Sequence, residues 1–262
     1  TICYRGFPKG RTLPLRKIFD FFNGSTAGDS PLQPQTNLCR LVKFEIEFKS
    51  KGKMAIYHFS VKTISRSAGR SAVACSAYRS GEKLIDERQG KEQDYTRKTG
   101  VEFTKIYAPE NTNPELLDRN QLWNTVEKVE RRKDANLARE FEIAFPHELN
   151  AEQRQSMLNE ICQELVKRHG VVVDAAIHAP HTQSGSDERN YHAHIMFTGR
   201  QIDLETGDFA KKRNRDFNKE NSSQTVNQWR ETFADIANKH LARAGYLSEV
   251  DHRSYAEQDN GL

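Results

Sequence analysis

The chain has 262 residues, of which 36% are hydrophobic and 29% are charged, a polar composition that still suffices to bury one core. No apolar run reaches the ~20 residues that a membrane-spanning helix needs, so we expect no membrane insertion. The net charge of +4 is not evidence for DNA binding, because residues 1–53 carry ten basic and four acidic residues while the remainder carries thirty and thirty-two.

The first 53 residues differ from the rest of the chain. They show weak periodicity and contain none of the nine histidines, and the chain starts with Thr1 rather than Met. We therefore expect the functional domain to span residues 54–262, beginning at Met54. Residues 1–53 are an N-terminal extension of uncertain status, either a tail or translated sequence upstream of the true start.

Local patterns after Met54 predict secondary structure in chain order. β-Branched and aromatic residues predict strands, small residues and a 3.6-residue period predict helices, and Gly or Pro marks their ends. Asn150 is a suitable N-cap for one of the helices. The expected elements are a strand at 55–61, a loop at 65–71, a helix at 72–80 before Gly81, an irregular insertion at 85–115, a helix at 122–132, a strand at 140–145, a helix at 151–168, a strand at 171–178, a turn at 185–190, a strand at 191–198 and a helix at 224–244. This order predicts an α+β fold, with one central antiparallel sheet flanked by helices.

Three histidines form the strongest candidate site. His192 and His194 lie two apart on a predicted strand, so their side chains share one face. His178 ends the preceding strand, and pairing of the two strands would bring the three imidazoles together. Three neutral imidazoles on rigid strands can hold a metal ion with open positions for substrate oxygens. The alternative is a set of hydrogen-bonded surface histidines.

Two glutamates form a second candidate group. Glu140 and Glu142 share one face of a predicted strand, whereas Phe141 and Ile143 take the other. Adjacent carboxylates repel each other unless a cation lies near, so a metal ion or a Lys or Arg partner is expected. Without such a partner, the pair is an ordinary solvated strand face.

A tyrosine and several basic residues complete the candidates. Tyr78 lies near the end of the first predicted helix, and nothing local distinguishes it from the other tyrosines. Basic side chains near such a site would follow a phosphate backbone, although each cluster is also compatible with a solvated face. The candidates for DNA contact are Arg66, Arg70, Arg79, Lys211, Lys212, Arg213 and Arg215.

Several segments resemble the MobA/MobL family of plasmid mobilisation relaxases, within the HUH endonuclease class. The first motif is Met54-Ala-Ile-Tyr-His-Phe-Ser60 with Ser65-Arg-Ser-Ala-Gly-Arg-Ser-Ala72 and the tyrosine that follows. The second is Glu140-Phe-Glu-Ile-Ala-Phe-Pro146, and the third combines Ile177-His-Ala-Pro180 with Asn190-Tyr-His-Ala-His194. Three motifs in family order are more specific than any one of them.

The resemblance implies a function and a partner set. It implies that Tyr78 is the nucleophile that nicks one DNA strand at a transfer origin (oriT) and stays attached as a phosphotyrosine. It implies that His178, His192 and His194 hold Mn²⁺ or Mg²⁺, with Glu140 and Glu142 in the same site. It also implies a palm-like sheet, single-stranded DNA as substrate, and relaxosome accessory proteins and a type IV coupling protein as partners. The chain would then be the nuclease domain of such a protein.

Other readings remain open at this stage. One is a metal-dependent hydrolytic nuclease with Glu140 or Glu142 as base, and another is a non-catalytic DNA-binding module. If Tyr78 were not the nucleophile, Tyr57 and Tyr95 would be the next candidates. A zinc peptidase is disfavoured because no HExxH motif occurs. The four cysteines lack CxxC spacing, which argues against a thiolate zinc site and fits a reducing cytoplasm: Cys3, Cys39, Cys75 and Cys162.

Overall fold

In the computed structural model of the chain, residues 57–180 and 187–253 are described. The elements are β1 (Phe59–Ser65), the 3-10 helix η1 (Arg66–Ala68), α2 (Ala72–Ser80), β2 (Lys83–Asp86), β3 (Lys91–Asp94), β4 (Val101–Tyr107), the 3-10 helix η2 (Pro114–Leu117), α3 (Arg119–Val129), β5 (Asn136–Ala144), α4 (Ala151–His169), β6 (Val171–His178), β7 (His192–Ile202), β8 (Phe209–Arg213) and α5 (Ser222–Arg243). The predicted domain start at Met54 lies outside the described residues and stays a prediction.

One antiparallel sheet organises the fold. Its strand order is β1-β5-β7-β6-β4, and β8 pairs with β7 beyond this path. Every pairing is antiparallel, and β2 and β3 form a separate hairpin. The described residues therefore confirm the predicted α+β class with a central antiparallel sheet.

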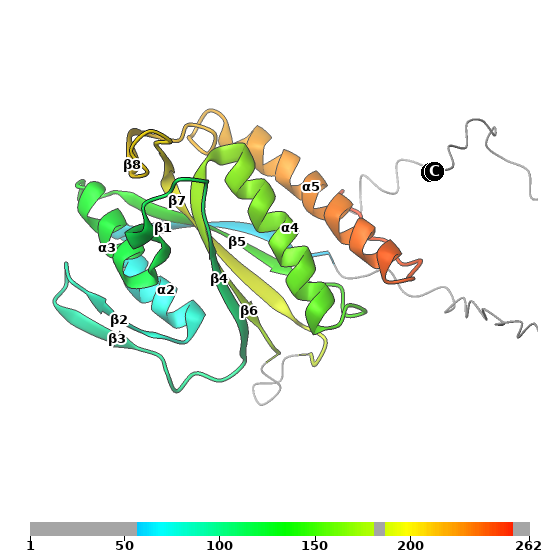
Figure 1. Ribbon diagram of the computed structural model, residues 1–262. Coiled ribbons are helices and arrows are strands. Elements are labelled where there is room, and N and C mark those ends of the chain that lie inside the picture. The colour runs from blue at the N-terminus through cyan, green and yellow to red at the C-terminus, as the bar shows by residue number, and fades with distance from the viewer. Residues whose placement is uncertain (1–56, 181–186, 254–262) are drawn as a thin grey trace, which may run out of the picture. The chain divides into compact units, whose positions relative to one another are not determined.

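Helices cover both faces of the sheet (Figure 1). On one face α4 and α5 pack over Phe141, Ile195 and other strand side chains that point to that face. On the opposite face α2 and α3 pack over Val172 and Met196. Side chains alternate along a strand, so the candidate residues of β5, β6 and β7 share the face of Met196, which carries α2. These residues are Glu140, Glu142, His178, His192 and His194.

Local capping explains where two helices begin and end. The hydroxyl of Ser71 accepts a hydrogen bond from the Ala74 backbone at the start of α2, and Gly81 ends that helix with φ of 69°. A side chain at Gly81 would be strained by this positive φ, and its Cβ would in addition lie only 3.2 Å from Cγ2 of Val101. Asn150 and Gln153 form a capping box at α4, which confirms Asn150 as an N-cap.

Two sequence predictions need correction. The prediction that residues 85–115 are irregular was wrong. This stretch contains most of the β2–β3 hairpin and all of β4, which pairs with β6. Because β4 is a partly exposed edge strand, its charged and polar residues blur the apolar alternation. The first strand starts at Phe59, four residues later than predicted. Among the described residues, no helix is long and apolar enough to cross a membrane.

Candidate active site

The three predicted histidines come together on the face that carries α2. His178 of β6 lies opposite His192 of β7 in the strand register, and His194 lies two residues further along β7. The ring centroids of His178 and His194 are 4.9 Å apart, and those of His192 and His194 are 5.3 Å apart. One nitrogen from each ring lies within 4.8 Å of the others, which confirms the predicted convergence.

Each imidazole has one ring nitrogen in contact with an oxygen acceptor. His178 Nε2 lies 2.7 Å from the carbonyl oxygen of Arg79, and His192 Nδ1 lies 3.1 Å from that of Asn190. His194 Nδ1 lies 2.7 Å from a carboxylate oxygen of Glu140. Because these partners only accept, each of these nitrogens carries the proton when the ring is neutral. The other nitrogen of each ring then holds the lone pair that a metal ion needs.

This arrangement fits a divalent cation. Burial lowers the pKa of His178 to about 3, so its ring is neutral at physiological pH. Three imidazoles whose second ring nitrogens contact oxygen acceptors are typical of an open metal site. Imidazole suits Mn²⁺ and related transition metals better than Mg²⁺, which prefers oxygen ligands.

Glu140 lies beneath the histidines and is completely buried. One of its oxygens contacts His194, and both accept hydrogen bonds from the Arg79 guanidinium, one of them 2.6 Å from Nη2. Burial alone would raise the pKa of Glu140, but hydrogen bonds from His194 and Arg79 outweigh it and hold the pKa at about 2. This carboxylate is therefore ionised and already partnered, which fits it for holding His194 in place.

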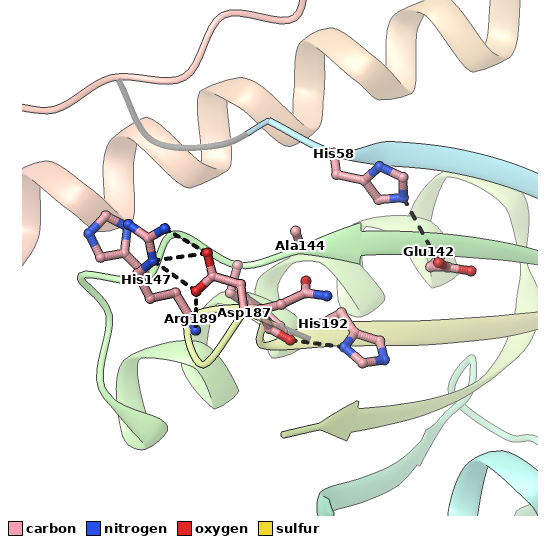
Figure 2. A pocket seen from close by; sticks show the side chains of 9 residues that line it. His58, Glu142, Ala144, His147, Asp187, Arg189 and His192 are labelled. Atoms are coloured by element: carbon pink, nitrogen blue, oxygen red, sulfur yellow. Dashed lines mark hydrogen bonds and ion pairs between the residues drawn. The ribbon is translucent and has the colours of Figure 1, made fainter. Parts of the chain in front are cut away.

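Glu142 is more accessible and adjoins a pocket. Lys62 donates to its carboxylate, and His58 Nε2 lies 3.9 Å from it. Lys62 on Glu142 and Arg79 on Glu140 are the cationic partners that two adjacent carboxylates were predicted to need. A pocket of about 410 Å³ opens beside Glu142 and His192 (Figure 2). Arg189, held by Asp187, also lines it, so the pocket has a polar rim next to the histidines.

Tyr78 occupies the last turn of α2, with 48% of its surface exposed. The next residue, Arg79, contacts His178 through its carbonyl and, through its side chain, Glu140, the partner of His194. The structure therefore brings the predicted tyrosine to the edge of the predicted metal site.

Two buried carboxylates attach α2 to the rest of the fold. Asp174 of β6 accepts hydrogen bonds from Ser76 of α2 at 2.6 Å and from Trp123 of α3 at 2.9 Å, and it pairs with Arg119. Glu127 of α3 accepts from the Ala72 backbone at 3.0 Å. These contacts fix the helix that carries Tyr78 against the sheet and against α3.

The other two candidate tyrosines occupy different places. Tyr57 packs against Phe233 of α5 and donates to the Arg230 carbonyl, on the face opposite the histidines. Burial raises its pKa to about 12. Tyr95 lies beside Tyr78, with ring centroids 5.3 Å apart in an edge-to-face arrangement.

The predicted DNA-contacting residues separate into three groups. Arg66 and Arg79 use their guanidinium groups inside the protein, on Glu127 and Glu140 respectively. Arg70 is exposed just before α2. The remaining four lie away from the histidines, on β8 or just after it. Their roles in DNA binding stay predictions.

A basic groove lies at the far end of β5 from the histidines. It is lined by Asn136 and Arg139, whereas Ala144 at the other end of the strand lines the pocket beside His192. Its lining contains eight basic and two acidic side chains. Lys212, Arg213 and Arg215 belong to this lining, and Lys211 is exposed nearby.

Sequence patterns missed one residue beside Tyr78, Lys98. Lys98 Nζ lies 3.8 Å from the centre of the Tyr78 ring and donates to the Tyr78 carbonyl at 2.8 Å. Burial, with a smaller effect of Arg79, lowers the pKa of Lys98 to about 8. Lys98 and Tyr95 both lie in the stretch that looked irregular, where no periodicity indicates which side chains face α2.

Comparison with known proteins identifies the family. The sequence profile of the MobA/MobL family matches residues 70–261. The chain belongs to the MobA/MobL family. A solved structure from a study of vancomycin resistance transfer in Staphylococcus aureus is 32% identical, with a TM-score of 0.68 over 77% of this chain and all of that one.

Curated relatives carry names from DNA transfer. Mobilization protein MobL of Acidithiobacillus ferridurans is 36% identical over 228 residues, which cover 78% of this chain and 59% of that protein. Conjugal transfer protein TraA of Rhizobium radiobacter is 32% identical over 80% of this chain and 21% of its own length. The chain thus spans only part of the curated relatives that it matches.

Proposed function

We propose that this chain is a DNA relaxase that nicks one strand at a plasmid transfer origin and remains attached through Tyr78. The observation that carries the proposal is the position of this exposed tyrosine, one residue before Arg79, which contacts both His178 and Glu140. Membership of the MobA/MobL family supports the same activity.

The proposed step is a phosphoester exchange. The phenolic oxygen of Tyr78 attacks the scissile phosphorus, and the bond from phosphorus to the leaving deoxyribose oxygen breaks as the new bond forms. The phenolic proton passes to solvent, and the leaving oxygen takes up a proton to become a hydroxyl. The number of phosphoester bonds is unchanged, so the joint can be resealed without ATP.

His178, His192 and His194 would hold a divalent cation, Mn²⁺ or Mg²⁺, which would neutralise charge on the scissile phosphate. The nitrogen donors favour Mn²⁺ for tight binding. Glu140 would orient His194, and Arg79 would keep Glu140 ionised. Glu142 would lie where the strand enters the pocket of about 410 Å³.

The preferred substrate would be single-stranded DNA. The tyrosine and the metal site must approach one phosphate in line, and a paired, stacked strand obstructs that approach. The basic groove that contains Lys212 and Arg215 would bind phosphates further along the DNA. Relaxosome accessory proteins and a type IV coupling protein would be partners of the whole protein, which would act in the cytoplasm.

Two alternatives receive less support. A water-using nuclease needs Glu140 or Glu142 as a general base. Both oxygens of Glu140 are already hydrogen-bonded and its pKa is held at about 2. Burial raises the pKa of Glu142, but the hydrogen bond from Lys62 outweighs it and lowers that pKa below its usual value. A non-catalytic DNA-binding module would not require an exposed tyrosine directly before the residue that contacts His178.

Covalent capture tests the proposal. The full chain would be incubated with Mn²⁺ and labelled single-stranded oligonucleotides that tile the DNA element encoding it, then denatured and separated by electrophoresis. We expect one oligonucleotide to give a denaturation-resistant adduct, which Tyr78→Phe abolishes while DNA affinity stays nearly unchanged. Tyr57→Phe and Tyr95→Phe are matched controls that should keep the adduct. Cleavage without an adduct would favour hydrolysis, and an intact adduct in Tyr78→Phe would move the nucleophile elsewhere.

A further inference from the structure

Tyr78 is exposed, but its ring is enclosed on two sides by the segment between β3 and β4. The Lys98 ammonium lies over the ring at 3.8 Å from its centre, and the Tyr95 ring meets it edge-on at an interplanar angle of 87°. We propose that Lys98 is a positioning residue for Tyr78, holding the ring for attack and favouring negative charge on the phenol. This inference rests on the proposed function, in which Tyr78 is the nucleophile.

The first reason is geometric. A half-exposed tyrosine in the last turn of a nine-residue helix would otherwise exchange between side-chain rotamers. Lys98 makes two contacts that act together, because its ammonium also donates to the Tyr78 carbonyl at 2.8 Å. The side chain therefore links the ring to the end of the helix backbone, which limits ring movement relative to the histidines.

The second reason is that the segment is itself fixed. The Tyr95 backbone donates to the Glu82 carbonyl at 3.1 Å, and the Lys98 backbone donates to the Tyr95 carbonyl at 2.9 Å. Glu82 follows directly after Gly81, the residue that ends the tyrosine helix. The tyrosine and its lysine are thus connected through a short hydrogen-bonded path, so Lys98 can hold the ring in one place.

The third reason is electrostatic. An ammonium over an aromatic face is attracted to the electron density of the ring, and this attraction grows as the phenol loses its proton. Lys98 therefore favours the phenolate both when Tyr78 attacks and when it leaves during resealing. Among the described residues, no carboxylate is paired with Lys98, so its charge is not neutralised by an acidic partner.

Substitution with a matched control tests the inference. Lys98→Met keeps the length of the side chain and removes its charge, whereas Lys98→Arg keeps a cation that can stack on the ring. Lys105→Met is the control, because Lys105 makes a similar contact, 4.9 Å from the centre of the Tyr107 ring, on the exposed edge strand β4. The substrate is the single-stranded oligonucleotide that wild type captures, and the measurements are the single-turnover nicking rate at saturating DNA, DNA affinity and Mn²⁺ affinity.

We expect Lys98→Met to lower the nicking rate about tenfold while DNA and Mn²⁺ affinities stay within about threefold of wild type. Lys98→Arg should recover most of the rate, and Lys105→Met should match wild type. Wild-type nicking by Lys98→Met would overturn the inference, as would an equal loss in a folded Lys98→Arg. If Lys98→Met fails to fold, Lys98→Gln replaces it under the same criteria. Absence of any Tyr78 adduct in wild type is a different result, because it contradicts the proposed function itself.

Discussion

Nδ1 of His194 lies 2.7 Å from a carboxylate oxygen of Glu140, a side chain with no exposed surface. In the neutral ring this contact places the proton on Nδ1, so that Nε2 has the lone pair that a metal ion needs. The guanidinium of Arg79 holds the carboxylate from the other side. We therefore expect Glu140 to orient a histidine of the proposed metal site without being a metal ligand itself.

The first prediction concerns this carboxylate. Glu140→Gln should weaken Mn²⁺ binding by about 10-fold to 100-fold, because the neutral amide no longer orients and polarises His194 as a carboxylate does. Glu142→Gln should change Mn²⁺ affinity less, since Glu142 lies 4.0 Å from the His194 nitrogen and pairs mainly with Lys62. Isothermal titration calorimetry with Mn²⁺ would compare the two variants. An equal loss of Mn²⁺ affinity in both would assign Glu142 the same role as Glu140.

The second prediction concerns the histidines. Replacing His178, His192 or His194 by Ala should lower Mn²⁺ affinity and nicking rate together, because each removes one of three ligands. Chelation of wild type with EDTA should stop nicking, and added Mn²⁺ should restore it. His147→Ala is a suitable control for Mn²⁺ affinity, because His147 lines the neighbouring pocket but lies outside the cluster. Unchanged Mn²⁺ affinity in all three variants would rule out the site.

The third prediction concerns Asp174, the buried carboxylate that anchors α2 to β6 through Ser76. Asp174→Asn should lower the free energy of unfolding by about 3 kcal/mol, because the buried Arg119 loses its buried partner carboxylate and keeps only the more exposed Glu82. Asp134→Asn, at an exposed carboxylate that pairs with exposed Arg132, should leave the unfolding midpoint unchanged. Urea titration measures both. A midpoint for Asp174→Asn equal to that of wild type would show that the anchor contributes little.

The fourth prediction is a pH dependence of the free energy of unfolding that comes from His169, the last residue of α4, which contacts Trp229 of α5. Trp229 Nε1 donates to its Nε2 at 2.9 Å, and Nδ1 lies 2.6 Å from Asp216. Burial lowers the pKa of His169, although Asp216 acts in the opposite direction. Since the folded pKa lies below the unfolded value of about 6.5, the unfolded chain binds protons more readily in that range. This stabilisation is complete above about pH 6.5 and is lost as pH falls toward the folded pKa.

His169→Gln isolates that contribution, because glutamine keeps an acceptor for Trp229 but does not titrate. Unfolding free energies of wild type and variant should converge as pH falls from about 7 to 5. The difference between the two proteins is the relevant quantity, because burial also lowers the pKa of His178. A difference that does not change with pH would contradict the prediction.

The fifth prediction concerns the basic groove. Removing two exposed cations with Lys212→Gln and Arg215→Gln should reduce the slope of log affinity against log salt by about 1.4, at roughly 0.7 per phosphate contact for single strands. The nicking rate at saturating DNA should stay unchanged, since the groove lies at the far end of β5. Lys91→Gln with Lys128→Gln removes the same charge elsewhere and serves as control. Equal slopes in both double variants would argue against a groove-specific contact.

The histidine cluster could be predicted because it depends on few assumptions. The two-residue period of a strand places His192 and His194 on one face, and pairing of two consecutive strands adds His178. The position of Tyr78 beside the cluster depends on contacts between distant residues, such as Ser76 with Asp174. No local pattern encodes such contacts.

The role of Arg79 shows the same limit. A lone arginine after the tyrosine looks like a phosphate contact, whereas in the fold it reaches Glu140, 61 positions away in sequence. Likewise β4 escaped prediction because its partner β6 supplies the pairing and its own outer edge stays exposed. Periodicity reports burial, so it is weakest at the margin of a sheet.

The shortness of α2 has a consequence for the order in which the chain folds during synthesis. An isolated helix of nine residues is marginal in water, so α2 needs Asp174 and Glu127 in place before it persists. Those carboxylates belong to β6 and α3, which both follow α2 along the chain. During synthesis Tyr78 therefore emerges well before the elements that orient it. If Tyr78 is the nucleophile as proposed, a nascent or partly unfolded polypeptide would hold the tyrosine without its cleavage geometry, and folding itself would delay DNA breakage until the domain is complete.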